Sequence, residues 1–189
     1  MDYVIIGNGE SRAPINVDDI KAFKIGCNGI YLHNKVNMLC AMDKFWRDKI
    51  EKEADVPLIS RKFNNVFQRN LQIHYGGIWQ ECSCAYRGYV SGTTAMDYIC
   101  DKAKKGDNIY LLGFDFDYTG ETVNHIYKDT QYHPRSNKPA QNENIFLNEA
   151  KQIFKRYPRL NFIWVNDNGW DLTQTMSVEE FKEKLCSKN

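Results

Sequence analysis

YVIIGNGESR, residues 3–12, begins with four apolar or aromatic residues and runs directly into a Gly-Asn-Gly turn. A turn after a strand needs only one glycine, whereas two glycines allow the backbone to approach a ligand closely. An unbroken apolar run is typical of a strand that is covered on both faces of a parallel sheet. The segment therefore predicts a buried strand, Tyr3–Ile6, whose carboxyl end leads into a ligand-binding turn.

The size and charge of the chain restrict its class. With 189 residues and 22.1 kDa, the chain is expected to form one domain, residues 1–189, with a substantial core. Its net charge of +1 gives no electrostatic reason to expect a partner that is duplex nucleic acid or a membrane surface. No apolar run reaches the length of a membrane span, and the first residues lack a signal-peptide pattern. We therefore expect a cytoplasmic protein without a membrane span.

The six cysteines are interpreted as reduced and mostly structural. Several lie in apolar segments, where cysteine behaves as a small hydrophobic residue. The pair Cys82 and Cys84 resembles a metal or redox motif, but no second Cys/His pair lies at zinc-binding spacing. Structural roles are therefore favoured over a metal site.

Short apolar runs alternate with helical patterns along the chain. The predicted strands are Tyr3–Ile6, Phe23–Cys27, Val36–Met42, Val56–Ile59, Ile109–Gly113 and Phe162–Val165. The predicted helices are Asp43–Ala54, Thr93–Lys105, Asn142–Tyr157 and Val178–Leu185. The last helix has a capping-box signature, with Ser177 before it and Glu180 three residues later. This alternation predicts an α/β fold with a Rossmann-like, mainly parallel sheet and helices on both faces.

Two long polar and aromatic stretches, residues 60–90 and 115–141, fit none of these elements. In compact α/β domains, such stretches are more often functional loops than idle connections. Both are therefore predicted to be functional loops of a nucleotide-binding domain.

The chemically interesting clusters follow predicted strands. GNGES follows the first strand, CNG the second, MDK the third and GFDFDY the fifth, while SGTT leads into a helix. In open α/β sheets, ligands bind outside the carboxyl ends of the strands, and a helix start favours an anion. Neither GxGxxG nor GxxxxGK[ST] occurs, which excludes the ordinary dinucleotide fingerprint and the P-loop.

The ordered blocks resemble a known family. VIIGNGES is similar to the opening of the bacterial sialyltransferases of glycosyltransferase family 42, where a Gly-Asn-Gly-Pro-Ser turn holds the nucleotide. FKIGCNGIYL, SGTTAMDYICDKAKKGDNIYLLGFDFDY and YHPRSN followed by NEAKQIF resemble later blocks of that family in the same order. GFDFDYTGETVNH also resembles the related MptE-like and motility-accessory proteins. The resemblance implies a glycosyltransferase-like enzyme with a GT-A-like variant of the Rossmann-like fold; residues 60–90 stay unmatched.

The resemblance assigns ligand-binding roles residue by residue. It implies that a nucleotide or nucleotide-sugar, with CMP favoured, is bound along the rim of the sheet. The implied nucleotide-binding residues are Asn8, Gly9, Ser11, Asn28, Ser91, Gly92, Gly113, Phe114, Asp115, Phe116 and Tyr118.

The same resemblance makes His133 the general base that deprotonates a hydroxyl acceptor of unknown class, a role that suits imidazole near neutral pH. His125 competes with His133 for this role. Asp43 stands where the family has an asparagine, and we include it among the catalytic candidates. Turnover of His133→Ala and His125→Ala would separate the two histidines.

No cofactor is assigned, but Mg²⁺ or Mn²⁺ remains an alternative. Asp115 and Asp117 form a DxD pair, and in an extended segment both carboxylates would face one side and hold a metal on a diphosphate. The MptE-like resemblance implies a second hypothesis, a Mg²⁺-dependent pyrophosphokinase in which Asp43 joins these two ligands. A third hypothesis is a nucleotide-binding protein without catalysis.

Overall fold

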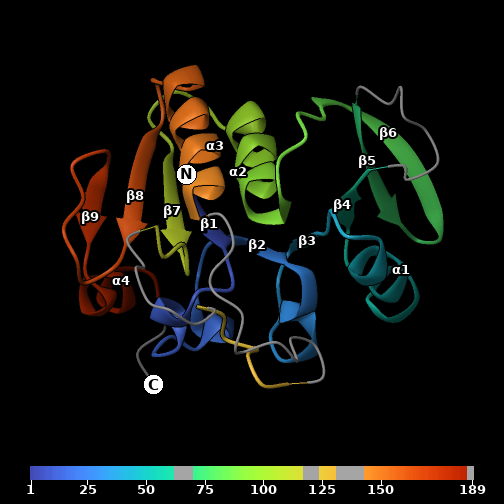
Figure 1. Ribbon diagram of the computed structural model, residues 1–189, viewed down its shortest axis with the longest axis horizontal. Helices are drawn as coiled ribbons and strands as arrows, with labels where there is room; N and C mark the ends of the chain where they lie inside the picture. Colours follow the sequence, from blue (N-terminus) through green and yellow to red (C-terminus); the bar gives the residue numbers. More distant parts are fainter. Residues whose placement is uncertain (62–69, 117–123, 131–142, 187–189) are drawn as a thin grey trace.

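The computed structural model describes residues 1–61, 70–116, 124–130 and 143–186. Nine strands form one sheet in the order β6-β5-β4-β3-β2-β1-β7-β8-β9 (Figure 1). The strands are β1 Asp2–Ile6, β2 Phe23–Cys27, β3 Met38–Cys40, β4 Leu58–Ser60, β5 Asn70–Tyr75, β6 Ile78–Ala85, β7 Asn108–Leu112, β8 Asn161–Val165 and β9 Gln174–Met176. All neighbouring strands pair in parallel except β4 with β5 and β5 with β6, which are antiparallel.

Helices cover both faces of this sheet, as the sequence predicts. The helices are α1 Lys44–Glu53, α2 Ser91–Lys102, α3 Glu143–Arg156 and α4 Val178–Leu185, and three short 3-10 helices are Glu10–Arg12, Val17–Asp19 and Asn28–Leu32. One core cluster joins α2 and α3 to the sheet through residues such as Ile5, Ile99 and Ile153. A second cluster lies on the opposite face and includes Ile50 of α1 and Phe181 of α4.

Alternating side-chain directions along β1 explain the two cores. Ile5 points into the cluster beneath α2 and α3, whereas Val4 and Ile6 point into the other, and all three are fully buried. A strand buried on both faces has no polar side, which is why its sequence reads as a continuous apolar run. The β-branched side chains of Val4, Ile5 and Ile6 also suit the pleated geometry of a strand.

The strand order reverses at β1. Strands β2, β3 and β4 extend the sheet on one side of β1, and β7, β8 and β9 extend it on the other. Ile6 pairs with Gly26 of β2 and with Leu112 of β7, so three carboxyl ends meet there. In open parallel sheets, ligands bind in the crevice at such a reversal.

The predicted elements occur with shifts of a few residues at their ends. Phe23–Cys27 and Val178–Leu185 have the predicted bounds, and the capping box between Ser177 and Glu180 is present. Strand β9 was not predicted. Its polar residues are largely exposed at the edge of the sheet, so they lack an apolar pattern.

The stretch 60–90, predicted as a functional loop, instead contains the hairpin β5–β6 over part of its length. Gly76 and Gly77 form its turn with φ of +59° and +78°, a conformation that favours glycine. The edge strand β6 is mostly exposed, so its sequence lacks the apolar run of a central strand. The hairpin was therefore not predicted, because an exposed strand lacks the apolar pattern of a buried one.

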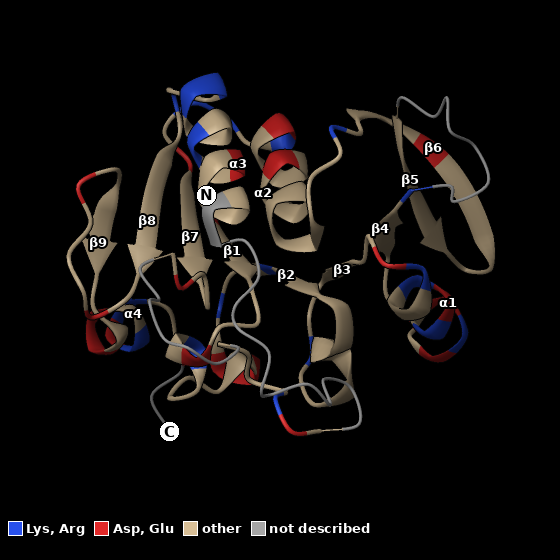
Figure 2. Ribbon diagram, in the orientation of Figure 1, with Lys and Arg blue, Asp and Glu red and all other residues tan. Residues whose placement is uncertain are grey.

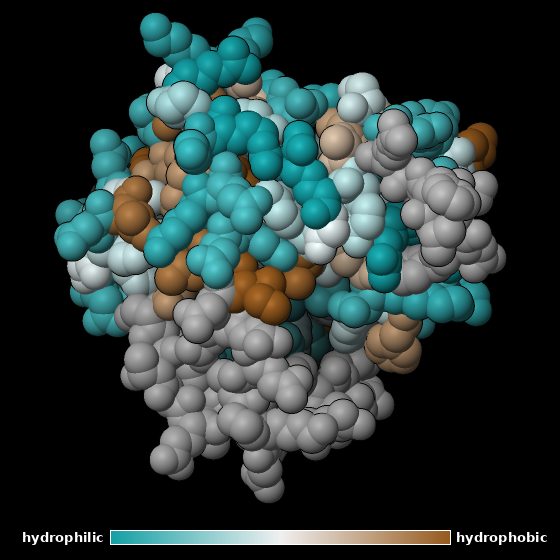
Figure 3. Space-filling model, turned by 45° about the horizontal axis from the view of Figure 1, so that its top comes forward, coloured by the Kyte–Doolittle hydropathy of each residue, from teal (hydrophilic) through white to brown (hydrophobic). Residues whose placement is uncertain are grey.

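In the described part of the chain, the helices and the sheet form a single compact domain. Figure 2 shows acidic and basic residues close together on α1 and on α4, in agreement with the net charge of +1. The described residues visible in Figure 3 are mostly hydrophilic, with a hydrophobic patch near the middle of the view. In the described part of the chain, no helix is both long enough and apolar enough to cross a membrane.

Candidate functional site

The turn after β1 packs directly against the segment after β7. The Gly7 N–H donates to the Leu112 carbonyl at 2.8 Å, and the Gly9 N–H donates to the Gly113 carbonyl at 2.9 Å. A Cβ at Gly7 would lie 2.4 Å from the Gly113 oxygen, and one at Gly9 would lie 2.5 Å from a carboxylate oxygen of Asp115. Both glycines are therefore required by a contact within the protein, whether or not a ligand also approaches them.

Ser11 and Asp115 hold the two segments together. The Ser11 N–H donates to Asp115 Oδ2 at 3.1 Å, and the Ser11 hydroxyl donates to Oδ1. An ionised carboxylate accepts about four hydrogen bonds, so Asp115 keeps acceptor capacity for a ligand. The structure thus brings together two predicted site residues that are more than a hundred positions apart, and it gives both a structural role.

Asn8 lies at the centre of this turn. Its backbone carbonyl accepts a hydrogen bond from the Ile126 N–H at 2.8 Å. Its side-chain oxygen Oδ1 is buried and has no hydrogen-bond partner among the described residues. An unpaired buried acceptor is costly, and such a group in a native structure calls for an explanation. Of the predicted site residues, Asn8 therefore has the clearest unused hydrogen-bond acceptor for a ligand.

A short segment, residues 124–128, docks beside the turn. Asn124 Oδ1 accepts from the Glu10 N–H at 2.8 Å, and the Lys128 ammonium lies 2.6 Å from the Glu10 carboxylate. The sequence analysis did not predict these contacts, because they join two loops without a recognisable motif.

Asn28 and Ser91 connect the end of β2 with the start of α2. The Ser91 hydroxyl donates to Asn28 Oδ1 at 3.2 Å and accepts from the Met42 N–H at 2.9 Å. Asn28 adopts φ of +52°, which is uncommon for a residue other than glycine. The Ser91 hydroxyl is therefore engaged within the protein.

The start of α2 already faces a carboxylate. Val90 at the N-cap makes no side-chain cap. Instead, Glu149 of α3 accepts from the Val90 N–H at 3.3 Å and from the Thr93 hydroxyl. Burial raises the pKa of Glu149, an effect that these hydrogen bonds oppose. When ionised, this carboxylate occupies the position that a helix start offers to an anion and disfavours a phosphate beside it.

Gly92, Phe114 and Phe116 pack inside the protein. A Cβ at Gly92 would lie 3.1 Å from the Phe114 ring, so the start of α2 rests on that ring. Phe116 stacks on Trp170 with ring centroids 5.0 Å apart. The two phenylalanines therefore have packing partners of their own, and Gly113, with φ of +69°, turns the chain between β7 and this aromatic group.

The catalytic candidates are only partly placed. His133, Tyr118 and Asp117 lie outside the described residues. Asp43 is exposed at the N-cap of α1, after β3, and makes no side-chain cap. Among the described residues, no group of three His, Cys, Asp or Glu side chains has the geometry to hold a metal ion.

His125 lies beside the turn, next to Ile126. Its Nδ1 accepts from the Tyr127 N–H at 3.2 Å, so the neutral ring carries its proton on Nε2. Nε2 is then a hydrogen-bond donor, and Nδ1 must release Tyr127 before it can accept a proton. This geometry suits His125 to donating a hydrogen bond more than to acting as a base.

Sequence analysis missed Arg12, the residue directly after the predicted Ser11. Its side chain is 3% exposed, and its Nη2 donates to the Tyr127 hydroxyl at 3.1 Å. Tyr127 also lies near His33, with ring centroids 5.9 Å apart. The only sequence signal for this cluster is a charged residue directly after the turn, and a charged residue does not predict burial.

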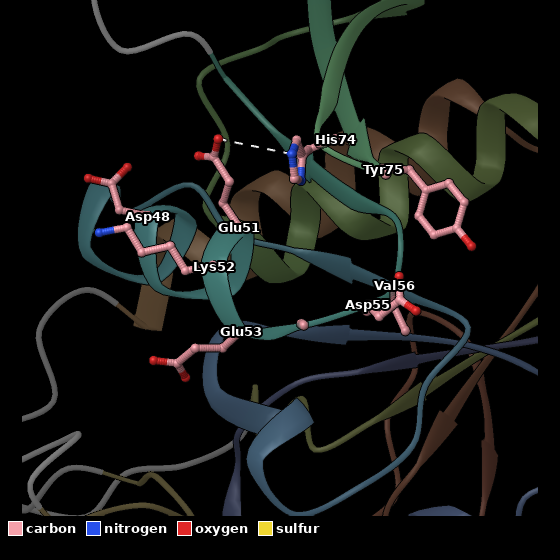
Figure 4. Close-up of a pocket in the computed structure, with 11 residues that line it drawn as sticks. Asp48, Glu51, Lys52, Glu53, Asp55, Val56, His74 and Tyr75 are labelled. Carbon is pink, nitrogen blue, oxygen red and sulfur yellow. Dashed lines mark ion pairs between the residues drawn. The ribbon is translucent and has the colours of Figure 1, made fainter.

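A separate pocket of about 630 Å³ lies between the end of α1 and the hairpin β5–β6 (Figure 4). Its carboxylates come from Asp48, Glu51, Glu53 and Asp55. His74, which is 7% exposed, points toward Glu51, with 4.0 Å between His74 Nε2 and the carboxylate. None of the predicted site residues lines this pocket.

All six cysteines are free. Cys27, Cys40, Cys84 and Cys100 are buried, as expected for small hydrophobic residues. Cys82 and Cys84 differ, because hydrogen bonding between the two thiols lowers the pKa of Cys82 to about 6 and raises the pKa of Cys84. The Cys84 thiol also donates to Asp101 Oδ2 at 3.3 Å.

Comparisons of the chain with models of known protein families, with curated proteins and with solved structures give no match.

Proposed function

We propose that the protein binds a nucleotide or nucleotide-sugar, with CMP-sugars favoured, at the carboxyl ends of β1, β2 and β7. In this proposal the sheet is Rossmann-like, and the protein is a glycosyltransferase-like enzyme that transfers the sugar to a hydroxyl acceptor. The observation that carries the proposal is the unpaired side-chain oxygen of Asn8, buried where the strand order reverses. A ligand that donates a hydrogen bond there would satisfy it.

Asn8 and Asp115 suit a nucleoside. Both offer acceptors, and a nucleoside presents donors in its ribose hydroxyls and, for cytosine, in the exocyclic amine. Asp115 is fixed by Ser11, so its free lone pairs are already oriented before the ligand arrives. Such preorganisation reduces the cost of ordering side chains on binding.

The chemical step requires a base for the acceptor and a donor for the leaving phosphate. Because His125 Nε2 carries the proton in the neutral ring, we assign it to hydrogen bonding of the nucleotide. His133 stays the proposed base. His133→Ala should then lower turnover by roughly a hundredfold with nucleotide affinity nearly unchanged. His125→Ala should weaken nucleotide binding more than it slows the chemical step. Full activity of His133→Ala would show that His133 is not the base.

A panel of ligands tests the proposal directly. Thermal unfolding is measured with CMP, CDP, UDP and ATP, each with and without Mg²⁺. We expect CMP to raise the melting temperature without metal, since a ligand at a hundred times its Kd stabilises the folded state by about 2.7 kcal/mol. Stabilisation by ATP only with Mg²⁺ would instead support the pyrophosphokinase. No shift with any of the ligands would contradict nucleotide binding.

Binding without catalysis is the second candidate function. It is favoured by the hydrogen bond that engages Nδ1 of His125, the one candidate base placed in the described part of the chain. Incubation of the protein with a CMP-sugar in water, without an acceptor, distinguishes the enzyme from the binding protein. An enzyme slowly releases CMP from its donor, whereas a binding protein leaves the donor intact.

A further inference from the structure

Arg12 is a buried cation at the rim of the sheet. It ends the 3-10 helix Glu10–Arg12, and its side chain runs beside Gly113, where an added Cβ would lie 3.0 Å from Arg12 Cδ. The guanidinium carbon lies 5.7 Å from the centroid of the Tyr127 ring. Burial raises the pKa of the Cys27 thiol, at the end of β2, and the charge of Arg12 opposes this effect. Arg12 therefore lies among the carboxyl ends of β1, β2 and β7.

The guanidinium is poorly compensated. In the described part of the chain, its only hydrogen bond goes to the Tyr127 hydroxyl, and no carboxylate forms an ion pair with it. Nε is buried without a partner. Arginine stays charged at any physiological pH, so it cannot escape the cost of burial by losing a proton. A buried cation with unused donors is a site prepared for an anion.

Arg156 shows how the same chain treats a compensated arginine. Its guanidinium lies over Tyr89 and donates to that hydroxyl at 3.1 Å, much as Arg12 does with Tyr127. In addition, its Nη1 lies 2.6 Å from the carboxylate of Asp97, which is buried. Arg156 therefore packs on a tyrosine and also pairs with a carboxylate. Arg12 packs on a tyrosine in the same way, but no anion lies beside it in the described part of the chain.

The nearby start of α2 does not compete for that anion, because Glu149 already occupies it. We infer that Arg12 binds the phosphate of the nucleotide, with the fork of its unused N–H groups directed at phosphate oxygens. This inference rests on the proposed function and deepens it, by placing the phosphate at Arg12 and the nucleoside at Asn8 and Asp115. Anion binding at Arg12 can also be measured without a nucleotide.

Arg12→Met removes the charge and keeps most of the volume. Chemical unfolding without ligand should show that Arg12→Met is as stable as the wild type or more stable, because an uncompensated buried charge is lost. The matched control, Arg156→Met, should be less stable, because it takes an ion-pair partner from Asp97. A comparable loss of stability in Arg12→Met would overturn the inference and make Arg12 a structural residue.

Binding supplies the second readout. Inorganic pyrophosphate should stabilise the wild type and Arg156→Met but not Arg12→Met, and Arg12→Lys should retain part of the effect. CMP affinity should fall about 10- to 100-fold in Arg12→Met, whereas cytidine affinity should change less than about threefold. Equal losses for CMP and cytidine would overturn the inference. If the wild type binds pyrophosphate but no nucleotide, the proposed function fails and the anion site stands; no pyrophosphate binding overturns the anion site.

Discussion

Gly9 shows how much a single residue determines at this site. The sequence predicted that the Gly-Asn-Gly turn approaches a ligand closely, and the structure shows that Gly9 approaches the segment after β7. Asn8, Ser11 and Asp115 were predicted together from resemblance, and the structure places them together. Arg12 could not be predicted, because its burial depends on a tyrosine more than a hundred positions away.

Gly9→Ala should destabilise the protein. The new Cβ would meet the Asp115 carboxylate at 2.5 Å, so the turn or the Ser11–Asp115 pair must shift. We expect a loss of about 1–3 kcal/mol in the free energy of unfolding, measured with urea. Gly169→Ala is the matched control, since an added Cβ there meets nothing within 4 Å. Equal stability of the two variants would contradict the described packing of the turn.

Cys82 should be the most reactive thiol near neutral pH. Its pKa is lowered to about 6 by hydrogen bonding with Cys84, with help from the charge of Lys102. A lowered pKa means that the thiolate predominates at pH 7. Alkylation by iodoacetamide, mapped by peptide mass, should therefore rise through pH 6 and level off by pH 7. In Cys84→Ala the rise should move toward the pKa of a free thiol, about 8.5; an unchanged profile would contradict this cause.

At the scale of elements, buried strands and capped helices were predictable because their signals are local. Strands β1, β2 and β7 are mostly apolar and buried, and α4 begins with a capping box. The edge strands β6 and β9 carry polar, exposed residues, so their pairing depends on neighbours that the sequence does not identify. The missed elements are thus those with the least burial.

Ser177→Ala tests the helix start that the sequence predicted. The Ser177 hydroxyl accepts from the Glu180 N–H at 3.2 Å, and Glu180 in turn accepts from the Ser177 N–H at 2.8 Å. Loss of such a cap costs about 1 kcal/mol of stability. Ser83→Ala on the edge strand β6 is the control, and the two variants should differ in urea unfolding by about that amount. No difference would show that α4 is held by Phe181 and its core alone.

At the scale of the whole molecule, the reversal of strand order at β1 brings the site together. The site joins the turn after β1 to two segments more than a hundred positions later, the one after β7 and residues 124–128. The alternation of strands and helices predicted this rim, because parallel strands place their carboxyl ends on one side. It did not predict which loops touch, since that depends on side chains such as Arg12 and Asp115.

The central claim is that this rim binds a nucleotide, and the affinity for CMP measured by calorimetry tests it most directly. Wild-type protein is compared with Asn8→Ala, Asp115→Ala and, as a control on the distant hairpin, Asn70→Ala. We predict that CMP binds the wild type and Asn70→Ala alike, and that each rim variant loses about 1–3 kcal/mol of binding free energy. Wild-type affinity in both rim variants would contradict the account.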